Sequence, residues 1–500
     1  MDYLDPRKRR FYNIRLVVGY CLIAVVIALG TLIIVYGANG YGINTKTGQI
    51  VQNALLFTDS IPGGAQIYLN GQSQNTTTSA RLVLPSGKYT LNLKKDGYRD
   101  WTRQFTLNEL SVARYVYPFL FPIKPVSTNL KPYQSAPGIY TESPDRRWLF
   151  IQVNETSTQS PAFDVYDTTT LDQPTPVVEQ LSIPPAILTD YSATSAFKVV
   201  EWSSDNDHVL LQHNFSGGNE FLVFSRAHPD ESFNINRLFN TSPSQVSLYD
   251  KKADQLYVYK QPDATLQRAN VGAKTLGPVL IKHVLAYKPY GRDLVTFITD
   301  NSEPVGKVGG RIWDNGQTYK LNEFKAGTTY LIDAAKFQGR FYYIVGSDTE
   351  DHISIYKDPL SGIKNPAFGK AVALLALHNP GTQKVSFSDN ARFIELENGQ
   401  SFSVYDIETD SVYQYSLAQP LAGIMVWMDG HRLMGVSGGK VLVMDYDGTN
   451  IQQLTPSSLD SGPLFSRDFK HMLTIAASSS DSSIVLQNID LRAGNDLPKR

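Results

Sequence analysis

One pattern recurs from about Gly138 to Asp490. In each repeat, a turn containing Asp or Gly is followed by a β-rich strand, a gap and a second strand. If Asp145 and Asp468 are equivalent positions, seven steps of about 46 residues connect them, a period that suits a β-propeller blade. A helical solenoid of similar period would need apolar residues at i, i+3 and i+4, and this pattern is absent. We therefore expect a seven- or eight-bladed β-propeller at 138–492.

Eight segments carry the first strand of this repeat, and each is followed by a partner strand such as AFDVYD or KVLVMD. In chain order they read SPDRRWLFIQV, SSDNDHVLLQH, YDKKADQLYVY, KPYGRDLVTFI, KFQGRFYYIVG, FSDNARFIEL, WMDGHRLMGV and FSRDFKHMLTI.

One unit of the repeat, Lys440 to Asp468, contains D-x-D-G-x-N-x-x-x-L-T and then F-S-x-D. It resembles the Asp-containing propeller repeats of the WD-type and Tol-associated periplasmic families. The resemblance implies a propeller and names no ligand. The segment 119–137 before the repeat is expected to be a linker, and 493–500 a tail.

A run without any charged side chain, LVVGYCLIAVVIALGTLIIVY, extends from Leu16 to Tyr36. As a helix it would span roughly 30 Å, the thickness of the hydrocarbon core of a bilayer. A cleaved signal peptide is the alternative, but its apolar stretch is usually about 7–15 residues long. The run therefore predicts a transmembrane helix at 16–36. Its Cys21 is the one cysteine of the chain, which excludes an internal disulfide.

The charges beside this run predict its orientation. The flank after it has only Lys46, whereas five cations precede it: Arg7, Lys8, Arg9, Arg10 and Arg15. Because Lys and Arg near a span remain on the cytoplasmic side, residues 1–15 are expected to be a cytoplasmic stub. The remainder is expected to lie outside the cell membrane, beginning with a Gly- and Asn-rich stalk at 37–57.

A short strand follows the predicted stalk. Ala65, Ile67 and Leu69 alternate with polar residues, the period of a half-buried strand, and Asn70-Gly71 is a hairpin signal. Further strands follow at SARLVL, KYTLNLK and WTRQFTL, separated by turns at Pro85-Ser86-Gly87 and Asp96-Gly97. The segment 58–118 is therefore expected to form a small antiparallel β-sandwich.

The residues of this segment resemble the PEGA domain of bacterial and archaeal surface proteins. The segment departs from that pattern at Gly63, where Glu is expected, and at Asn70, where Asp is usual. The resemblance implies a non-enzymatic extracytoplasmic module. The positions that carry it are Pro62, Gly64, Ala65, Asn70, Gly71, Pro85, Gly87, Tyr89, Gly97 and Tyr98.

The composition and the short motifs of the chain point to no specific catalytic or ligand-binding site. The net charge is −1 and no basic surplus indicates a nucleic-acid partner. Ser437 lies in G-x-S-x-G, but a strand follows, so a hairpin turn is expected instead of a nucleophile elbow. Asp445 begins DYDG, which lacks the later ligands of a calcium loop. His208 and His213 have no metal-ligand spacing, and the acidic residues of Thr349–Asp351 are expected in a solvated loop.

Together these features predict an all-β, membrane-anchored, extracytoplasmic binding or scaffold protein of the bacterial cell surface. It would present the PEGA-like module and the propeller to a protein, peptide or cell-wall glycan partner. We expect no catalytic residue, cofactor or metal. The alternative is a propeller-type glycan hydrolase or lyase, which a cluster of carboxylates with a histidine in the propeller channel would favour.

Overall fold

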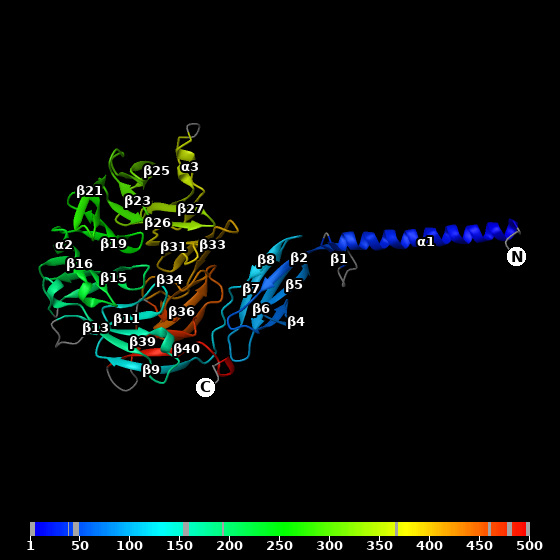
Figure 1. The fold of residues 1–500 in the computed structure, drawn as a ribbon, viewed down its shortest axis with the longest axis horizontal. Coiled ribbons are helices and arrows are strands. Elements are labelled where there is room, and N and C mark those ends of the chain that lie inside the picture. Colours follow the sequence, from blue (N-terminus) through cyan, green and yellow to red (C-terminus); the bar gives the residue numbers. More distant parts are fainter. Residues whose placement is uncertain are drawn as a thin grey trace. The chain divides into compact units, whose positions relative to one another are not determined.

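The computed structural model describes residues 6–38, 40–43, 50–153, 160–192, 195–365, 369–458, 462–477 and 483–496. An N-terminal helix is followed by β-structure throughout, as Figure 1 shows, so the expected all-β class is confirmed. The chain forms two compact units. The first comprises Met1–Ile123 with Ala493–Arg500, and the second comprises Lys124–Arg492.

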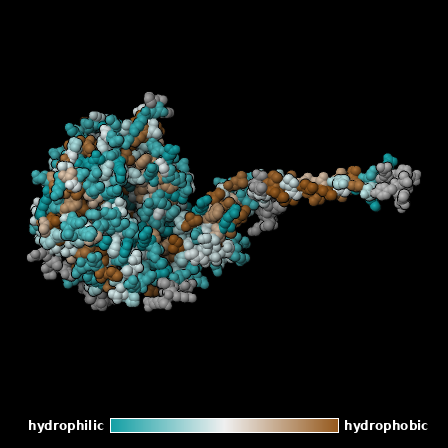
Figure 2. Space-filling view, viewed as in Figure 1, coloured by the Kyte–Doolittle hydropathy of each residue, from teal (hydrophilic) through white to brown (hydrophobic). Residues whose placement is uncertain are grey.

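Helix α1 extends over Pro6–Ala38 and contains the whole predicted span. Its segment Arg10–Gly37 is long and apolar enough to cross a membrane, and none of its most apolar window is buried in the structure. Brown, hydrophobic side chains follow α1 in Figure 2. A helix whose apolar side chains are exposed on all sides would be unstable in water, so these features fit membrane anchoring.

Two four-stranded sheets form a sandwich in the first unit. One sheet holds β4, β3, β6 and β7 in that order, and in the other β2 pairs with β1, β5 and β8. The bounds are β1 (Tyr41–Ile43), β2 (Ile50–Thr58), β3 (Gln66–Leu69), β4 (Gln72–Thr77), β5 (Ala80–Pro85), β6 (Gly87–Lys94), β7 (Trp101–Leu107) and β8 (Val112–Tyr115).

The core of the sandwich follows from strand alternation. Ile67 pairs with Leu93, and Leu69 with Leu91, and Ala65 lies on the same buried face. Leu56 of β2 is also fully buried. Burying each large apolar side chain contributes about 1.5–3 kcal/mol, so this predicted face holds the two sheets together.

The expected stalk at 37–57 differs from the structure. It contains β1 and most of β2, whose Ala54 and Leu56 are buried against β5 and β8. Residues 54–57, ALLF, are apolar and form part of β2. Residues 37–49 are polar, and for that reason the whole segment was expected to be a stalk. The sandwich therefore begins at least eight residues before position 58.

Eight four-stranded antiparallel sheets, here sheets 1 to 8, make up the described part of the second unit. Sheets 1 to 4 are β10 (Tyr140–Glu142), β11 (Trp148–Val153), β12 (Ala162–Asp167), β13 (Val178–Ser182); β14 (Ala196–Trp202), β15 (His208–Phe215), β16 (Gly218–Ser225), β17 (Phe233–Asn234); β18 (Gln245–Tyr249), β19 (Lys252–Lys260), β20 (Thr265–Asn270), β21 (Thr275–Lys282); β22 (Ala286–Pro289), β23 (Leu294–Thr299), β24 (Lys307–Asp314) and β25 (Gln317–Lys325).

The remaining four sheets repeat this order, except that the last strand of sheet 8 comes from the start of the unit. Sheets 5 to 8 are β26 (Tyr330–Phe337), β27 (Arg340–Ser347), β28 (His352–Lys357), β29 (Leu375–His378); β30 (Lys384–Phe387), β31 (Phe393–Asn398), β32 (Ser401–Asp406), β33 (Ser411–Ser416); β34 (Val426–Trp427), β35 (Arg432–Ser437), β36 (Lys440–Asp445), β37 (Gln452–Pro456); β38 (Leu464–Phe465), β39 (His471–Ala477), β40 (Ile484–Asp490) and β9 (Val126–Tyr133).

The eight strand pairs expected from the repeat are the second and third strands of these sheets. They read as nearly continuous apolar runs because both of their faces are covered, and every residue of β12, β23 and β35 is buried. Neighbouring sheets share apolar clusters: Phe150 of sheet 1, for example, packs against Trp202 of sheet 2 with ring centroids 5.0 Å apart.

The first and last sheets are also neighbours. Leu149 and Ile151 of sheet 1 share a core with Leu473, Ile475 and Leu486 of sheet 8. In Figure 1 the colours run once around this unit, from cyan through green and yellow to red beside cyan.

Strand β9 joins the two ends of the second unit. It pairs antiparallel with β40 from Tyr133↔Ile484 to Val126↔Asp490. The expectation of a linker at 119–137 is therefore wrong for the residues of β9. These residues form the outer strand of sheet 8, where they pair with the backbone groups that β40 would otherwise leave unpaired. Sequence position alone could not reveal a pairing between strands about 350 residues apart.

Short helical turns complete the structure and connect strands without forming a layer of their own. They are α2 (Ile235–Leu238), α3 (Pro359–Ile363), η1 (Thr168–Thr170), η2 (Pro185–Ile187), η3 (Pro229–Glu231) and η4 (Gly494–Asp496).

Candidate functional site

The residues predicted for the PEGA-like motif lie in turns and in the core of the sandwich. Asn70 and Gly71 have φ of 50° and 78°, the two successive positive angles of a type I′ turn between β3 and β4. Gly64 and Gly97 also have positive φ. Tyr98 is buried, and its hydroxyl accepts a hydrogen bond from the backbone N–H of Ala493. Pro62 follows Ile61, which forms an isolated β-bridge with Phe119, and Gly87 is the first residue of β6.

The repeated Asp of the second unit is a turn residue. Between first and second strands, its carboxylate accepts a hydrogen bond from the backbone N–H two positions later, and a serine two positions earlier donates to it. Asn replaces Asp in sheet 6. The pairs are Ser143 with Asp145, Ser388 with Asn390, and Ser466 with Asp468. These side chains accept hydrogen bonds from backbone N–H groups in a tight turn. The repeated Asp therefore shapes the turn between the first and second strands.

Several first strands contact one another: β14 contacts β18, β22 contacts β26, and β26 contacts β30. Leu248 of β18 donates its N–H to Glu201 of β14, and Lys288 of β22 lies 3.8 Å from Asp333 of β26. These strands are short or lack a strong pattern, and for that reason the repeat analysis did not identify them.

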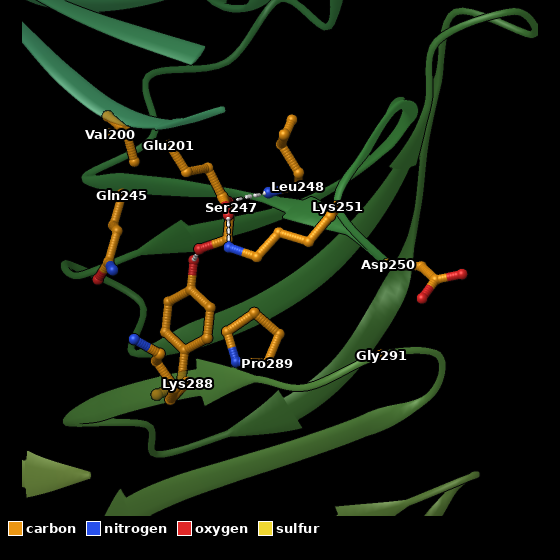
Figure 3. A pocket seen from close by; sticks show the side chains of 11 residues that line it. Val200, Glu201, Gln245, Ser247, Leu248, Asp250, Lys251, Lys288, Pro289 and Gly291 are labelled. Carbon is orange, nitrogen blue, oxygen red and sulfur yellow. Dashed lines mark hydrogen bonds and ion pairs between the residues drawn. The ribbon is translucent and has the colours of Figure 1, made fainter. Parts of the chain in front are cut away.

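A cavity of about 180 Å³ lies along three of these first strands, β14, β18 and β22. Figure 3 shows side chains from all three strands around it. Most of the side chains that line the cavity are polar, and Leu248, Val200 and Pro289 form the apolar part of its wall. The lining residues are Val200, Glu201, Gln245, Ser247, Leu248, Asp250, Lys251, Tyr287, Lys288, Pro289 and Gly291.

Two hydrogen-bonded groups organise this cavity. The Glu201 carboxylate accepts from the N–H of Leu248 and pairs with the Lys251 ammonium, as the dashed lines in Figure 3 show. The hydroxyls of Ser247 and Tyr287 lie 3.0 Å apart and are buried, and burial raises the pKa of Tyr287 well above its usual range. The side chains of Gln245 and Lys288 add hydrogen-bond donors to the lining, so the cavity can hold a small polar group.

A second charged cluster joins sheets 1, 6, 7 and 8. Burial raises the pKa of Glu142, on β10, to about 7, although Arg146 lies 3.3 Å away. The Arg146 guanidinium also donates to Asp389 at 3.0 Å and to the Met428 carbonyl at 2.6 Å. Glu142 further accepts from the N–H of Phe465, on β38. Internal partners thus occupy these carboxylates.

A third cluster lies on β30 and β31. The Lys384 ammonium is 3.0 Å from Glu395 and 3.6 Å from Glu397, and both carboxylates are buried. Burial, followed by the charge of Glu395, raises the pKa of Glu397 to about 7. The charge of Glu395 beside it therefore disfavours ionisation of Glu397, and the Lys384 ammonium only partly offsets this effect.

The residues of the motifs considered for catalysis or metal binding have partners within the chain. Ser437 ends β35, is buried, and donates to the Pro420 carbonyl, as expected for a hairpin. Asp445 accepts from Asn450 in the turn after β36. His213 is fully buried against Glu220 at 2.9 Å, whereas His208 contacts Asp205.

Glu350, in the acidic loop, accepts from the N–H of Lys325. Among the described residues no group of three or more His, Cys, Asp or Glu is placed to hold a metal ion.

The residues predicted for the membrane lie in or beside α1. Leu16 and Tyr36 are within the helix, and the Tyr36 ring lies 5.0 Å from that of Tyr41 in β1. The helix bounds also include all five predicted cations, from Arg7 to Arg15.

The comparison with solved structures returns distant likenesses. An oligogalacturonate lyase from Vibrio parahaemolyticus matches at 9% identity and TM-score 0.38, covering 74% of this chain and 99% of the lyase chain. Hsv2 from Kluyveromyces lactis matches at 8% identity and TM-score 0.38, covering 71% and 97%. An uncharacterized protein from Listeria monocytogenes matches at 14% identity and TM-score 0.38, covering 67% and 93%. At these TM-scores the likenesses imply no activity for this chain.

None of the curated proteins matches this sequence. One family does: residues 54–118 match the PEGA domain, which confirms the resemblance expected for the sandwich.

Proposed function

We propose that this chain is a membrane-anchored binding or scaffold protein of the bacterial cell surface, with its bulk outside the cytoplasm. The observation that carries the proposal is the order of two features. An apolar helical segment, Arg10–Gly37, none of whose most apolar window is buried, precedes a segment, 54–118, that matches the PEGA domain. The helix would hold the sandwich at the membrane, and the second unit would present its surface to a partner.

We further infer that the second unit is an eight-bladed β-propeller. Eight four-stranded sheets, contacts between their first strands, and the pairing of β9 with β40 support this arrangement. Such a ring offers a central cavity for a partner, and the Glu201–Lys288 cavity is the candidate site. A protein, peptide or cell-wall glycan with exposed hydroxyl or amide groups would suit its donors and acceptors.

The orientation is proposed from the five cations before the helix, which would keep residues 1–15 in the cytoplasm. Cysteine labelling tests it, because Cys21 is the one cysteine. In a Cys21→Ser background, a cysteine replacing Ser73 or Asp263, one exposed position in each unit, should react with a membrane-impermeant maleimide in wall-stripped cells. A cysteine replacing Asp2 should react only after lysis. Labelling of position 2 in intact cells, with protection of 73 and 263, would overturn the proposal.

We propose binding without catalysis. The glycan hydrolase or lyase alternative needs carboxylates that can reach a substrate. Glu142 is held by Arg146 and by the Phe465 N–H, and Glu201 by the Leu248 N–H and Lys251, which supports a structural role for both. Cleavage of wall glycan by the purified chain that Glu142→Gln or Glu201→Gln abolishes would favour the enzyme instead.

A further inference from the structure

The outer face of the sheet formed by β5, β2 and β8 is uncovered. Alternation places Ala54, Leu56 and Thr58 of β2 in the core, so Leu55 and Phe57 point to the opposite face. Register then fixes two rows across the three strands. Leu55 pairs with Val83 on one side and Val112 on the other.

The second row combines aromatic and basic side chains. Phe57 lies between Arg81 of β5 and Arg114 of β8, and the Arg114 guanidinium stacks 5.4 Å from the centre of the Phe57 ring. Arg81 and Arg114 are exposed. The "lipid face" is defined here as Leu55, Phe57, Arg81, Val83, Val112 and Arg114.

Several large apolar side chains on and beside the lipid face are open to solvent. Val83 is 57% exposed, Val112 51%, and Leu110, in the turn before β8, 61%. Single exposed apolar residues are ordinary, but adjacent ones on a sheet face indicate a contact surface. Two carboxylates border it, Glu109 and Asp59, and Asp59 accepts from the N–H of Ser60.

The chain ties this face to the end of the apolar helix. Asn53, next to Leu55, donates its N–H to the Gly40 carbonyl at 2.7 Å, and Gly40 donates to the Gly37 carbonyl at 3.1 Å. A Cβ on Gly40 would lie 3.1 Å from Leu110. Because three residues span at most about 11 Å, Gly40, which contacts Asn53 and lies beside Leu110, remains within about that distance of Gly37, where the apolar segment ends.

We propose that the lipid face lies on the outer surface of the membrane that α1 crosses, with its apolar row in the headgroup layer and its arginines on lipid phosphates. The inference rests on the proposed membrane anchoring. Two observations select the lipid surface as the occupant: the direct tether to the spanning helix, and the arginines beside the apolar row. Interfacial binding of this kind combines apolar burial with attraction to anionic lipid.

The test uses the full chain in nanodiscs with one protein per disc and 30% or no phosphatidylglycerol. Spin labels are placed through Val83→Cys, Val112→Cys or the control Ser73→Cys, on β4 of the other sheet, all in the Cys21→Ser background. We expect labels at 83 and 112 to be several-fold less accessible to a water-soluble nickel chelate than the label at 73. Arg81→Glu with Arg114→Glu should abolish this protection in anionic discs, whereas Lys88→Glu, an exposed charge on the other sheet, should not.

A label on Cys21 of the natural chain separates the two proposals. If Cys21 is shielded in the bilayer while positions 83 and 112 are as accessible as 73, the lipid face is refuted and the anchor stands. If Cys21 is open to the chelate, the anchor itself fails. Protection of 83 and 112 only in discs that hold two chains would make the face a contact between copies and overturn the proposal.

Discussion

Glu142 shows how single residues of the second unit respond to their surroundings. Its carboxyl lies on β10 beside Tyr140 and Arg146, and Asp389 shares the same guanidinium. Burial raises its pKa to about 7 from an ordinary 4.5. Neither the residue type nor its neighbours in sequence predict this shift, since Arg146, four residues later, lowers the pKa and the burial that raises it comes from the folded structure.

The shift predicts a pH dependence. Between pH 4.5 and 7 the folded chain retains a proton at Glu142 that the unfolded chain has released, so stability falls as pH rises through this window. Glu142→Gln removes the titration. From pH 5 to 8 the free energy of unfolding of the natural chain should fall by up to about 3 kcal/mol more than that of the variant, at 1.36 kcal/mol per unit.

Urea unfolding followed by tryptophan fluorescence at several pH values measures this difference. Glu397, whose pKa is also raised to about 7, is present in both chains and cancels. Parallel stability curves for the two chains would contradict the prediction.

At the scale of the element, the repeat consists of the turn between the first and second strands, followed by the second and third strands. Its Asp-containing turn was visible in the sequence, because a side-chain acceptor two residues before a backbone donor is a local requirement. The first strands themselves were not predicted. Residues such as Val426–Trp427 of β34 are too few to display a period, and only pairing defines them as a strand.

The turn before β39 offers a test. Asp468→Ala leaves the Lys470 N–H and the Ser466 hydroxyl without their acceptor and should lower the free energy of unfolding by about 1 kcal/mol. Asp468→Asn retains the acceptor, and the chain itself uses Asn390 at the equivalent place, so it should cost less than half as much. Chemical unfolding of both variants decides the matter, and equal losses would mean that the carboxylate charge is what the turn needs.

At the scale of the whole molecule, β9 connects the first and last sheets of the second unit. Its Lys131 ammonium and Tyr133 hydroxyl contact the buried Asp164 carboxylate of sheet 1 at 2.7 and 2.8 Å. The strand therefore pairs with sheet 8 through its backbone and is attached to sheet 1 through its side chains. Because the two ends of the unit meet there, loosening β9 should weaken the unit as a whole.

Asp164→Ala tests this attachment. It leaves a buried tyrosine hydroxyl and an ammonium without their acceptor, and should destabilise the second unit by about 3 kcal/mol. Tyr133→Phe removes one hydrogen bond but leaves Lys131 on Asp164, and should cost about 1 kcal/mol. Limited chymotrypsin digestion adds a local measurement, since a released β9 exposes the bond between Tyr133 and Gln134. Unchanged digestion at Tyr133 in Asp164→Ala would show that backbone pairing alone holds the strand.

By itself, the sequence determined the features that depend on local order along the chain. The apolar run from Leu16 to Tyr36, the alternation at Ala65, Ile67 and Leu69, and the Asp-containing turns each follow from interactions between residues close in sequence. They were enough to predict the spanning-length helix, the PEGA-like sandwich and the eight buried strand pairs.

The tertiary structure decided the rest, because the remaining features join residues that are distant in sequence. The pairing of β9 with β40, the Glu201–Lys288 cavity and the raised pKa of Glu142 all arise where separate sheets meet. Burial and charge at those places depend on which sheets become neighbours, and no local pattern of residues encodes that neighbourhood.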